Sequence, residues 1–249
     1  MNDLRNIKNI SFVELAGLPG AGKSTTLRAL RKEIGNSKLK FTRIYVNSRF
    51  KLLISLPFIP YVIIRFYRVF KTLVVAKVSN KKIKIRLRTV LSILAILTSS
   101  TMEYWIARFE STIMRKKVFL DGGFIQWSLS IWIRSPIEIQ EILWKAYLTH
   151  IPNNILCIVL ECDPNEALRR AKSREEGVPG VMTSREWNTK EGSDLVSQYQ
   201  KMHDLLKSEA VQSKVDCIYI NSETDASSQA NMICKNIKKF ILIRKLVLY

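Results

Sequence analysis

Eight residues near the start of the chain have the types and the spacing that bind phosphate. They are Gly17-Leu18-Pro19-Gly20-Ala21-Gly22-Lys23-Ser24, which fit the Walker A pattern G-x-x-x-x-G-K-[ST]. The apolar run at 11–16 predicts a buried strand before the loop, and the residues from Lys23 to about Ile34 predict a helix after it. Glycines allow consecutive backbone amides to turn toward one phosphate, and the start of a helix adds partial positive charge.

This arrangement assigns a role to each polar residue of the loop. The amides up to Thr25 would hold the phosphates, Lys23 would reach the β- and γ-phosphates, and the Ser24 hydroxyl would ligate Mg²⁺. The alternative is an ordinary glycine-rich turn between a strand and a helix. Because both motif and context are satisfied, we expect a nucleoside triphosphate site, with ATP and Mg²⁺ as cofactors.

A second candidate is Asp121, which ends the short apolar run at 118–121 and precedes two glycines. In open α/β sheets, ligands bind at the carboxyl ends of the strands. Asp121 there could hold the metal through water or accept a proton from an attacking hydroxyl. The alternative is a turn-forming aspartate. The phosphate loop favours the functional role.

A third candidate is the arginine-rich segment at 162–187. Asp163-Pro164 predicts a strand exit and a helix start. Arg170 and Arg174 follow on that helix, and glycine and proline at 177–180 predict a loop. Guanidinium groups on a mobile lid can stabilise the charge that develops in phosphoryl transfer, so both arginines are candidate catalytic residues. The alternative is a solvated helix face, because two glutamates lie beside Arg174.

The elements that must position these residues alternate between strand and helix. Five short strands are predicted, at 11–16, 42–47, 118–123, 155–160 and 217–220. Helices are predicted after the loop, over 101–116, from Pro136 and from Asn165, over 195–210, and to Leu246 or beyond. This order predicts an α/β fold with three αβα layers and a five-stranded parallel sheet. We expect one domain over residues 1–249, with a basic helical insert at about 48–98 and a lid at about 169–188.

Charge is concentrated in the first half of the chain. The formal net charge is +19, and no Asp or Glu occurs from Ile34 to Met102 although Lys and Arg recur there between apolar residues. Three interpretations are open: a helical insert packed on the core, contact with an anionic membrane surface, or nucleic-acid binding. The insert is favoured slightly over the membrane, and no recognition motif supports nucleic acid. Its apolar runs fall short of about 18 to 20 uninterrupted residues, so a membrane span is not expected.

Cysteine usage and the first residues indicate the compartment. The four cysteines form no CxxC pair, and three of them lie in or beside apolar runs, as is typical of buried thiols in a reducing compartment. The first twelve residues are too polar for a secretory signal. We expect a cytoplasmic protein, with a peripheral position on the inner face of a membrane left open.

Four segments together resemble the thymidylate kinase branch of the nucleoside and nucleotide monophosphate kinases. They are AGLPGAGKST, YWIARFESTIMRKKVFLDGG, VLECDPNEALRRAKSRE and YINSETDAS. The resemblance implies that Arg108 contacts the acceptor and that the loop from Asn221 to Asp225 lies near the adenine. The family's Arg after the strand-end Asp is Gly122 here, and its acidic-Pro-Gly element after the second strand is missing. Both departures lie on the acceptor side and indicate an acceptor other than thymidylate. The loop also looks like that of adenylylsulfate kinases.

The combined hypothesis is a kinase. The chain would transfer the γ-phosphoryl group of Mg-ATP to an unidentified small-molecule or lipid-linked acceptor. The alternative is a membrane-associated P-loop ATPase, or a regulatory protein that binds a nucleoside triphosphate without a small acceptor. The oligomeric state stays open.

Overall fold

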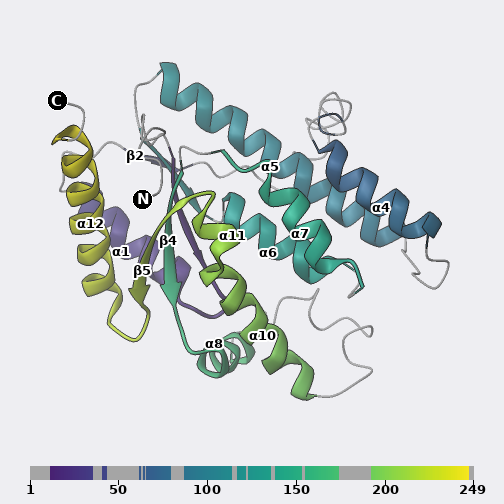
Figure 1. Ribbon diagram of the computed structural model, residues 1–249. Helices are drawn as coiled ribbons and strands as arrows, with labels where there is room; N and C mark the ends of the chain where they lie inside the picture. The colour runs from purple at the N-terminus through teal and green to yellow at the C-terminus, as the bar shows by residue number, and fades with distance from the viewer. Residues whose placement is uncertain are drawn as a thin grey trace.

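A five-stranded parallel sheet forms the centre of the molecule (Figure 1). The computed structural model describes residues 12–35, 41–43, 62, 64, 66–79, 87–113, 117–121, 123–135, 138–152, 155–173 and 192–246. The strand order of the sheet is β2-β3-β1-β4-β5. The strands are β1 (Phe12–Gly17), β2 (Phe41–Arg43), β3 (Lys117–Asp121), β4 (Ile155–Glu161) and β5 (Asp216–Asn221).

The two central strands are the apolar runs that the sequence marked. Every residue of β1 is buried, and so is every residue of β4 except the last. Strand β1 pairs in parallel with β3 on one side and with β4 on the other. Continuous apolar strands of this kind require helices on both faces of the sheet. The expected α/β fold with a five-stranded parallel sheet is therefore confirmed.

Helices cover both faces of the sheet (Figure 1). Helix α1 (Lys23–Gly35) packs against α12 (Ala226–Leu246) on one face, and α6 (Phe124–Arg134) packs against α7 (Gln140–Leu148) on the other. The remaining described helices are α4 (Tyr67–Ser79), α5 (Leu87–Ile113), α8 (Pro164–Lys172), α10 (Gly192–Lys207) and α11 (Glu209–Gln212).

Several predicted boundaries differ from the structure. The helix expected over 101–116 is the end of a longer helix, α5, because its apolar residues continue the core contacts of Ile93 and Leu97. The helix expected from Pro136 begins at Gln140, and α6 lies between β3 and that point without having been predicted. The helix expected over 195–210 ends at Lys207, and Ser208 starts the separate helix α11. Most of the second strand expected at 42–47 lies outside the described residues.

The basic region forms helices where it is described. Helix α4 ends at Ser79, and α5 begins at Leu87. Within α5, the stretch Thr89–Ile106 is long and apolar enough to cross a membrane by length and composition, although core helices of soluble proteins meet the same test. Its Ser100 hydroxyl lies 3.0 Å from the Tyr147 hydroxyl of α7, inside the protein. Part of this apolar stretch is packed in the core, because Ile93 and Leu97 are buried, whereas Leu91 is exposed.

Candidate functional site

The phosphate loop connects β1 to α1 at the carboxyl edge of the sheet. Gly20 and Gly22 have positive φ angles of 92° and 88°, a region that side chains with a Cβ rarely adopt. A Cβ on Gly20 would also lie 1.9 Å from the Ala167 carbonyl oxygen of α8. Glycine at this position is thus required both by the backbone angle and by the close approach of α8.

The Lys23 ammonium lies over the beginning of this loop. Its Nζ donates to the carbonyl oxygens of Gly17 at 2.7 Å and Leu18 at 2.8 Å. The Ser24 and Thr25 side chains are exposed in the first turn of α1. The cation and the helix N-terminus therefore converge on one small region, as the motif predicts.

A cavity of about 320 Å³ opens beside the loop. Its lining joins three segments that are distant in the sequence: the phosphate loop with the start of α1, helix α8, and the turn between β5 and α12. The lining residues are Gly20, Gly22, Thr25, Thr26, Arg170, Ser222, Glu223, Thr224, Ala226 and Gln229. The volume lies at the lower end of the range of small-molecule sites, and its position next to the loop suits the nucleoside part of a nucleotide.

Hydrogen bonds hold the turn after β5 against α1. The Thr26 hydroxyl donates to the side-chain oxygen of Gln229, and the side-chain nitrogen of Gln229 donates to the Thr224 carbonyl oxygen at 2.6 Å. Asp225 caps α12, because its Oδ1 accepts the amides of Ser227 and Ser228 at 3.0 and 2.9 Å. The turn that the resemblance assigned to the adenine thus lies at the cavity.

Arg170 is the predicted lid arginine that the structure places in the cavity wall. Its Nε donates to Glu166 Oε1 at 2.6 Å, and Arg169 pairs with the other oxygen of the same carboxylate at 2.6 Å. The two arginines lower the pKa of Glu166, Arg169 having the larger effect. Asp163 caps α8 by accepting the amides of residues 165 and 166. Arg174 lies outside the described residues, as does most of the expected lid.

Asp121 is placed by the sheet register. It is the last residue of β3 and pairs with Leu15 of β1, two residues before the phosphate loop. This position is at the same edge as the loop, as the strand-end rule predicts. Gly122, which replaces the arginine of the resembling family, lies outside the described residues.

A buried carboxyl group connects the loop to the segment that follows Asp121. Glu14 of β1 is fully buried, and its Oε1 accepts the Gln126 amide at 2.8 Å, close to the start of α6. The Gln126 side-chain oxygen in turn accepts the Gly17 amide at 3.4 Å. A Cβ on Gly123 would lie 2.9 Å from the Glu14 carboxyl group, so glycine provides the space for it.

The environment of Glu14 disfavours its charged form. Loss of hydration on burial raises the pKa from its ordinary 4.5 to about 7, and nearby Glu103 adds to the rise. Backbone amides at the start of α6 act in the opposite sense. Among the described residues, the second oxygen of Glu14 has no hydrogen-bond partner.

The predicted acceptor residue, Arg108, does not line the cavity. It is exposed on α5, where its guanidinium donates to the Tyr104 hydroxyl at 3.0 Å and lies 5.9 Å from the centroid of the Trp105 ring. The structure thus brings Gly20, Gly22 and Thr25 of the phosphate loop, Arg170 and the predicted turn after β5 together around one cavity. Arg108 lies on a separate surface.

Sequence reasoning missed several residues of this region. Glu14 was overlooked inside an apolar strand, although an acid in such a run is itself a signal. Gln126 and Gln229 are brought to the loop by α6 and α12, and no local pattern marks them. Thr26 is the second residue after the last defined position of the motif.

Comparisons with known proteins bear on the fold. No protein-family model matches the sequence, and no curated protein matches it. The solved structures that are similar to this chain include two of deoxyadenosine kinase from M. mycoides, one with the products dCMP and a flexible dCDP bound and one with dATP bound. The first has a TM-score of 0.54 at 13% identity and covers 92% of this chain and 99% of its own. The second has a TM-score of 0.50 at 14% identity and covers 91% and 99%.

These structures are kinases of deoxynucleosides, so the narrower likeness to thymidylate kinases stays a prediction. Identities this low show similarity of fold alone. The similarity to these structures and the phosphate loop between β1 and α1 lead to one conclusion: the chain has the fold of the P-loop kinases.

Proposed function

We propose that the protein is a kinase that transfers the γ-phosphoryl group of Mg-ATP to an acceptor other than thymidylate. The observation that carries the proposal is the shared cavity of the phosphate loop, Arg170 and the turn after β5. The fold of the deoxyadenosine kinases supports a nucleoside-type acceptor, and a lipid-linked acceptor is the second class to test.

On the donor side, the loop amides and Lys23 would hold the phosphates. Lys23 now binds carbonyl oxygens of its own loop, so its ammonium is already within reach of a group seated there. Mg²⁺ prefers oxygen ligands, and Ser24 and Asp121 would supply them from neighbouring ends of α1 and β3. When bound, the metal would neutralise charge on the β- and γ-phosphates. Asp121 is also the candidate to accept the proton of an acceptor hydroxyl.

Arg170 would stabilise the transferring group from the cavity wall. Arg169 provides a matched comparison, because both arginines pair with Glu166 and only Arg170 lines the cavity. Both ion pairs are near the surface, so losing either costs little stability. Arg174 would act with Arg170, whereas Arg108 lies on a separate surface and is assigned no part in the transfer.

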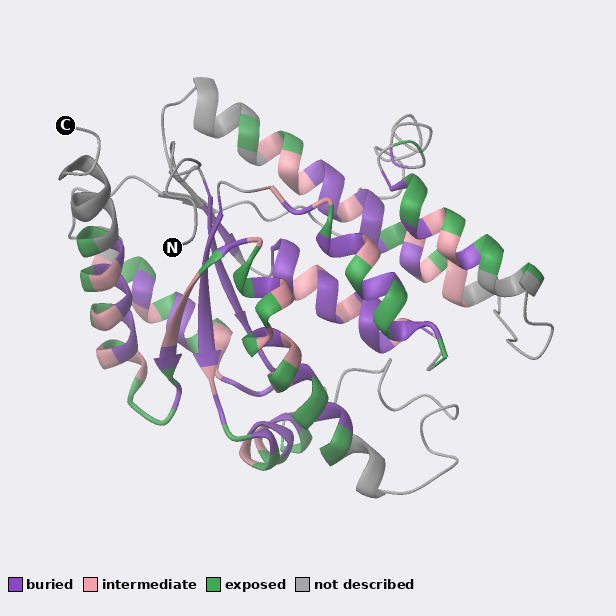
Figure 2. Cartoon of the chain, in the orientation of Figure 1, coloured by how far each residue is buried: buried purple, intermediate pink, exposed green. Residues whose placement is uncertain are grey.

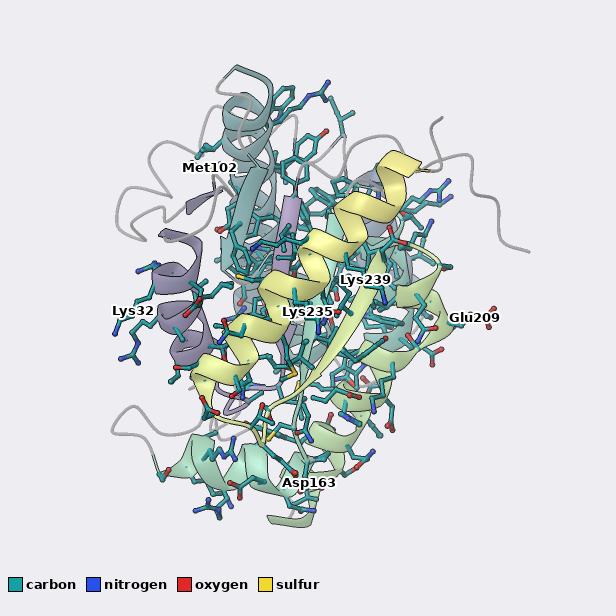
Figure 3. All side chains as sticks on the ribbon, turned by 90° about the vertical axis from the view of Figure 1, so that its left-hand side faces the viewer. Lys32, Met102, Asp163, Glu209, Lys235 and Lys239 are labelled. Atoms are coloured by element: carbon teal, nitrogen blue, oxygen red, sulfur yellow. The ribbon has the colours of Figure 1, made fainter. Side chains whose placement is uncertain are left out.

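The test is transfer of label from γ-labelled ATP. The purified chain is incubated with Mg²⁺, labelled ATP and, separately, deoxynucleosides, nucleoside monophosphates and a lipid extract. We expect a labelled product in one of these pools. Lys23→Ala should lower the rate by about a hundredfold or more, since it removes a preorganised cation from the phosphates. Lys32→Ala, at the exposed end of the same helix (Figure 3), should leave the rate unchanged.

Two outcomes would contradict the proposal. Release of free phosphate alone, with no labelled product, would indicate an ATPase or a nucleotide-binding regulator. Equal losses of rate in Arg170→Ala and Arg169→Ala would remove the role assigned to Arg170. Isothermal titration with Mg-ATP distinguishes a failure of transfer from a failure of binding.

A further inference from the structure

Helix α4 and the described residues just before it (62, 64 and 66) carry apolar side chains on two opposite sides. Its inner side is packed against α7, where the Phe66 ring stacks on Tyr147 with centroids 5.7 Å apart and meets His150 edge-on at 5.0 Å. The buried residues of this side recur every three or four positions: Val62, Phe66, Val69 and Leu73. Among the described residues, this inner side packs the segment against α7.

The opposite side is apolar and exposed. We define the outer α4 face by five residues of the helix, Tyr67, Arg68, Lys71, Val74 and Val78, together with Ile64, which lies just before the helix. Its four apolar side chains are 60% to 75% exposed, Ile64 and Val78 being the most open at 75% and 73%. Figure 2 shows exposed stretches alternating with buried ones along α4, which lies on the side of the molecule away from α12 (Figure 1). An exposed apolar face of this kind marks a contact surface.

The charge of the outer α4 face restricts its partner. Arg68 and Lys71 are exposed among the apolar side chains, and the sequence has no acidic residue from Ile34 to Met102. The partner must therefore be anionic and must also take up apolar side chains. A nucleic acid meets the first requirement, but its phosphate backbone does not bury valine and isoleucine.

A second copy of the chain meets the second requirement, but it conflicts with the charge. In a two-fold interface each face meets itself, so the cations of the two copies would come together with no acid on the face to pair them. An anionic lipid bilayer meets both requirements, because headgroup phosphates attract cations and the acyl boundary accepts apolar side chains. The described helix has 13 residues and is about 20 Å long, too short to cross a bilayer of about 30 Å.

We propose that the outer α4 face lies on an anionic membrane surface. The valines and Ile64 would enter the acyl boundary, Tyr67 would lie at the headgroup level, and Arg68 and Lys71 would contact lipid phosphates. This surface is separate from the cavity beside the phosphate loop, so the proposal does not depend on phosphoryl transfer. It predicts a protein held peripherally on a membrane surface.

The test is co-sedimentation of the full chain with lipid vesicles. Vesicles of phosphatidylcholine with about 30% phosphatidylserine are compared with phosphatidylcholine alone, at about 0.05 M and 0.5 M NaCl. We expect binding to the anionic vesicles that weakens at high salt. Arg68→Gln with Lys71→Gln should lower the partition coefficient about 25-fold, at about fivefold for each cation. Val74→Ser with Val78→Ser should lower it about tenfold or more.

Matched controls remove the same groups elsewhere. Lys235→Gln with Lys239→Gln deletes two exposed cations of α12 (Figure 3), and Ile142→Ser deletes an exposed apolar side chain of α7. Both should bind vesicles as the unmodified chain does. Amide hydrogen exchange of the unmodified chain, with and without anionic vesicles, locates the contact without any variant. We expect added protection in peptides covering residues 67–79.

Each contrary result overturns the proposal. The contrary results are an absence of binding to anionic vesicles at low salt, a loss of vesicle binding in the α12 control equal to that of the α4 variants, and an absence of added protection in residues 67–79. A dimer in analytical ultracentrifugation that Val74→Ser with Val78→Ser dissociates would assign the outer α4 face to a second copy instead. Retention of binding to Mg-ATP in the same variants confirms that they are folded.

Discussion

Replacing the buried carboxyl group of Glu14 with an amide should change how stability depends on pH. Glu14→Gln keeps a side-chain oxygen that can accept the Gln126 amide, now accepted at 2.8 Å, and it removes the ionisable group. The side chain is fully buried beside the phosphate loop, and its second oxygen is without a partner among the described residues. The substitution therefore separates the effect of charge from the effect of shape.

The size of the effect follows from the raised pKa. Because the folded protein holds the Glu14 proton more tightly than the unfolded chain, the stabilisation is complete below about pH 4.5 and is lost as the pH rises through about 7. The difference between the two pKa values corresponds to about 3 kcal/mol of stability, since each tenfold change in proton affinity is worth about 1.36 kcal/mol. About 2.5 kcal/mol of it falls between about pH 5 and pH 8.

The assay is urea unfolding of the two proteins at several values of pH in this window. The free energy of unfolding of the unmodified chain should fall by about 2.5 kcal/mol more than that of Glu14→Gln as the pH rises from about 5 to 8. Glu141→Gln is the control, because its exposed partner Lys145 lowers the pKa of Glu141 and keeps it ionised throughout. Its curve should run parallel to that of the unmodified chain. Parallel curves for Glu14→Gln would refute the reasoning.

Three further substitutions test the loop and its supports. Gly20→Ala should abolish detectable ATP affinity or lower the free energy of unfolding by about 3 kcal/mol or more, because its Cβ would overlap the Ala167 carbonyl group. Gly22→Ala has open space around it and should lower the free energy of unfolding by only about 1 to 2 kcal/mol. Similar losses in thermal unfolding would contradict this contrast. Thr26→Val should cost about 1 to 3 kcal/mol in urea, because it leaves a buried Gln229 oxygen unpaired, whereas the exposed neighbour Thr25→Val should be nearly neutral. Asp225→Ala should cost about 1 kcal/mol by removing the cap of α12, and an unchanged urea midpoint would contradict that role.

Local patterns were sufficient for the phosphate loop and for much of the sheet. The positive φ angles of Gly20 and Gly22 and the position of Lys23 depend on neighbours within a few residues, so the motif contains most of the information. The apolar runs of β1 and β4 predict buried parallel strands for the same reason. Elements whose signal depends on distant contacts were less predictable. Helix α6 was missed, because its apolar residues make it a helix only through packing on β1 and α7.

The cavity and the outer α4 face were decided by the tertiary structure. Arg169 and Arg170 are adjacent in the sequence and share one carboxylate, yet only the packing of α8 against the loop makes Arg170 a cavity residue. Glu14 acquires its raised pKa because β3, β4 and α6 exclude water around it. On α4, apolar side chains occur on both sides, and only the docking of Phe66 against α7 decides which side stays exposed. The sequence by itself determined the local geometry of the phosphate loop, because that geometry depends on a few neighbouring residues. Burial and contact depend on distant segments, so only the tertiary structure decided them.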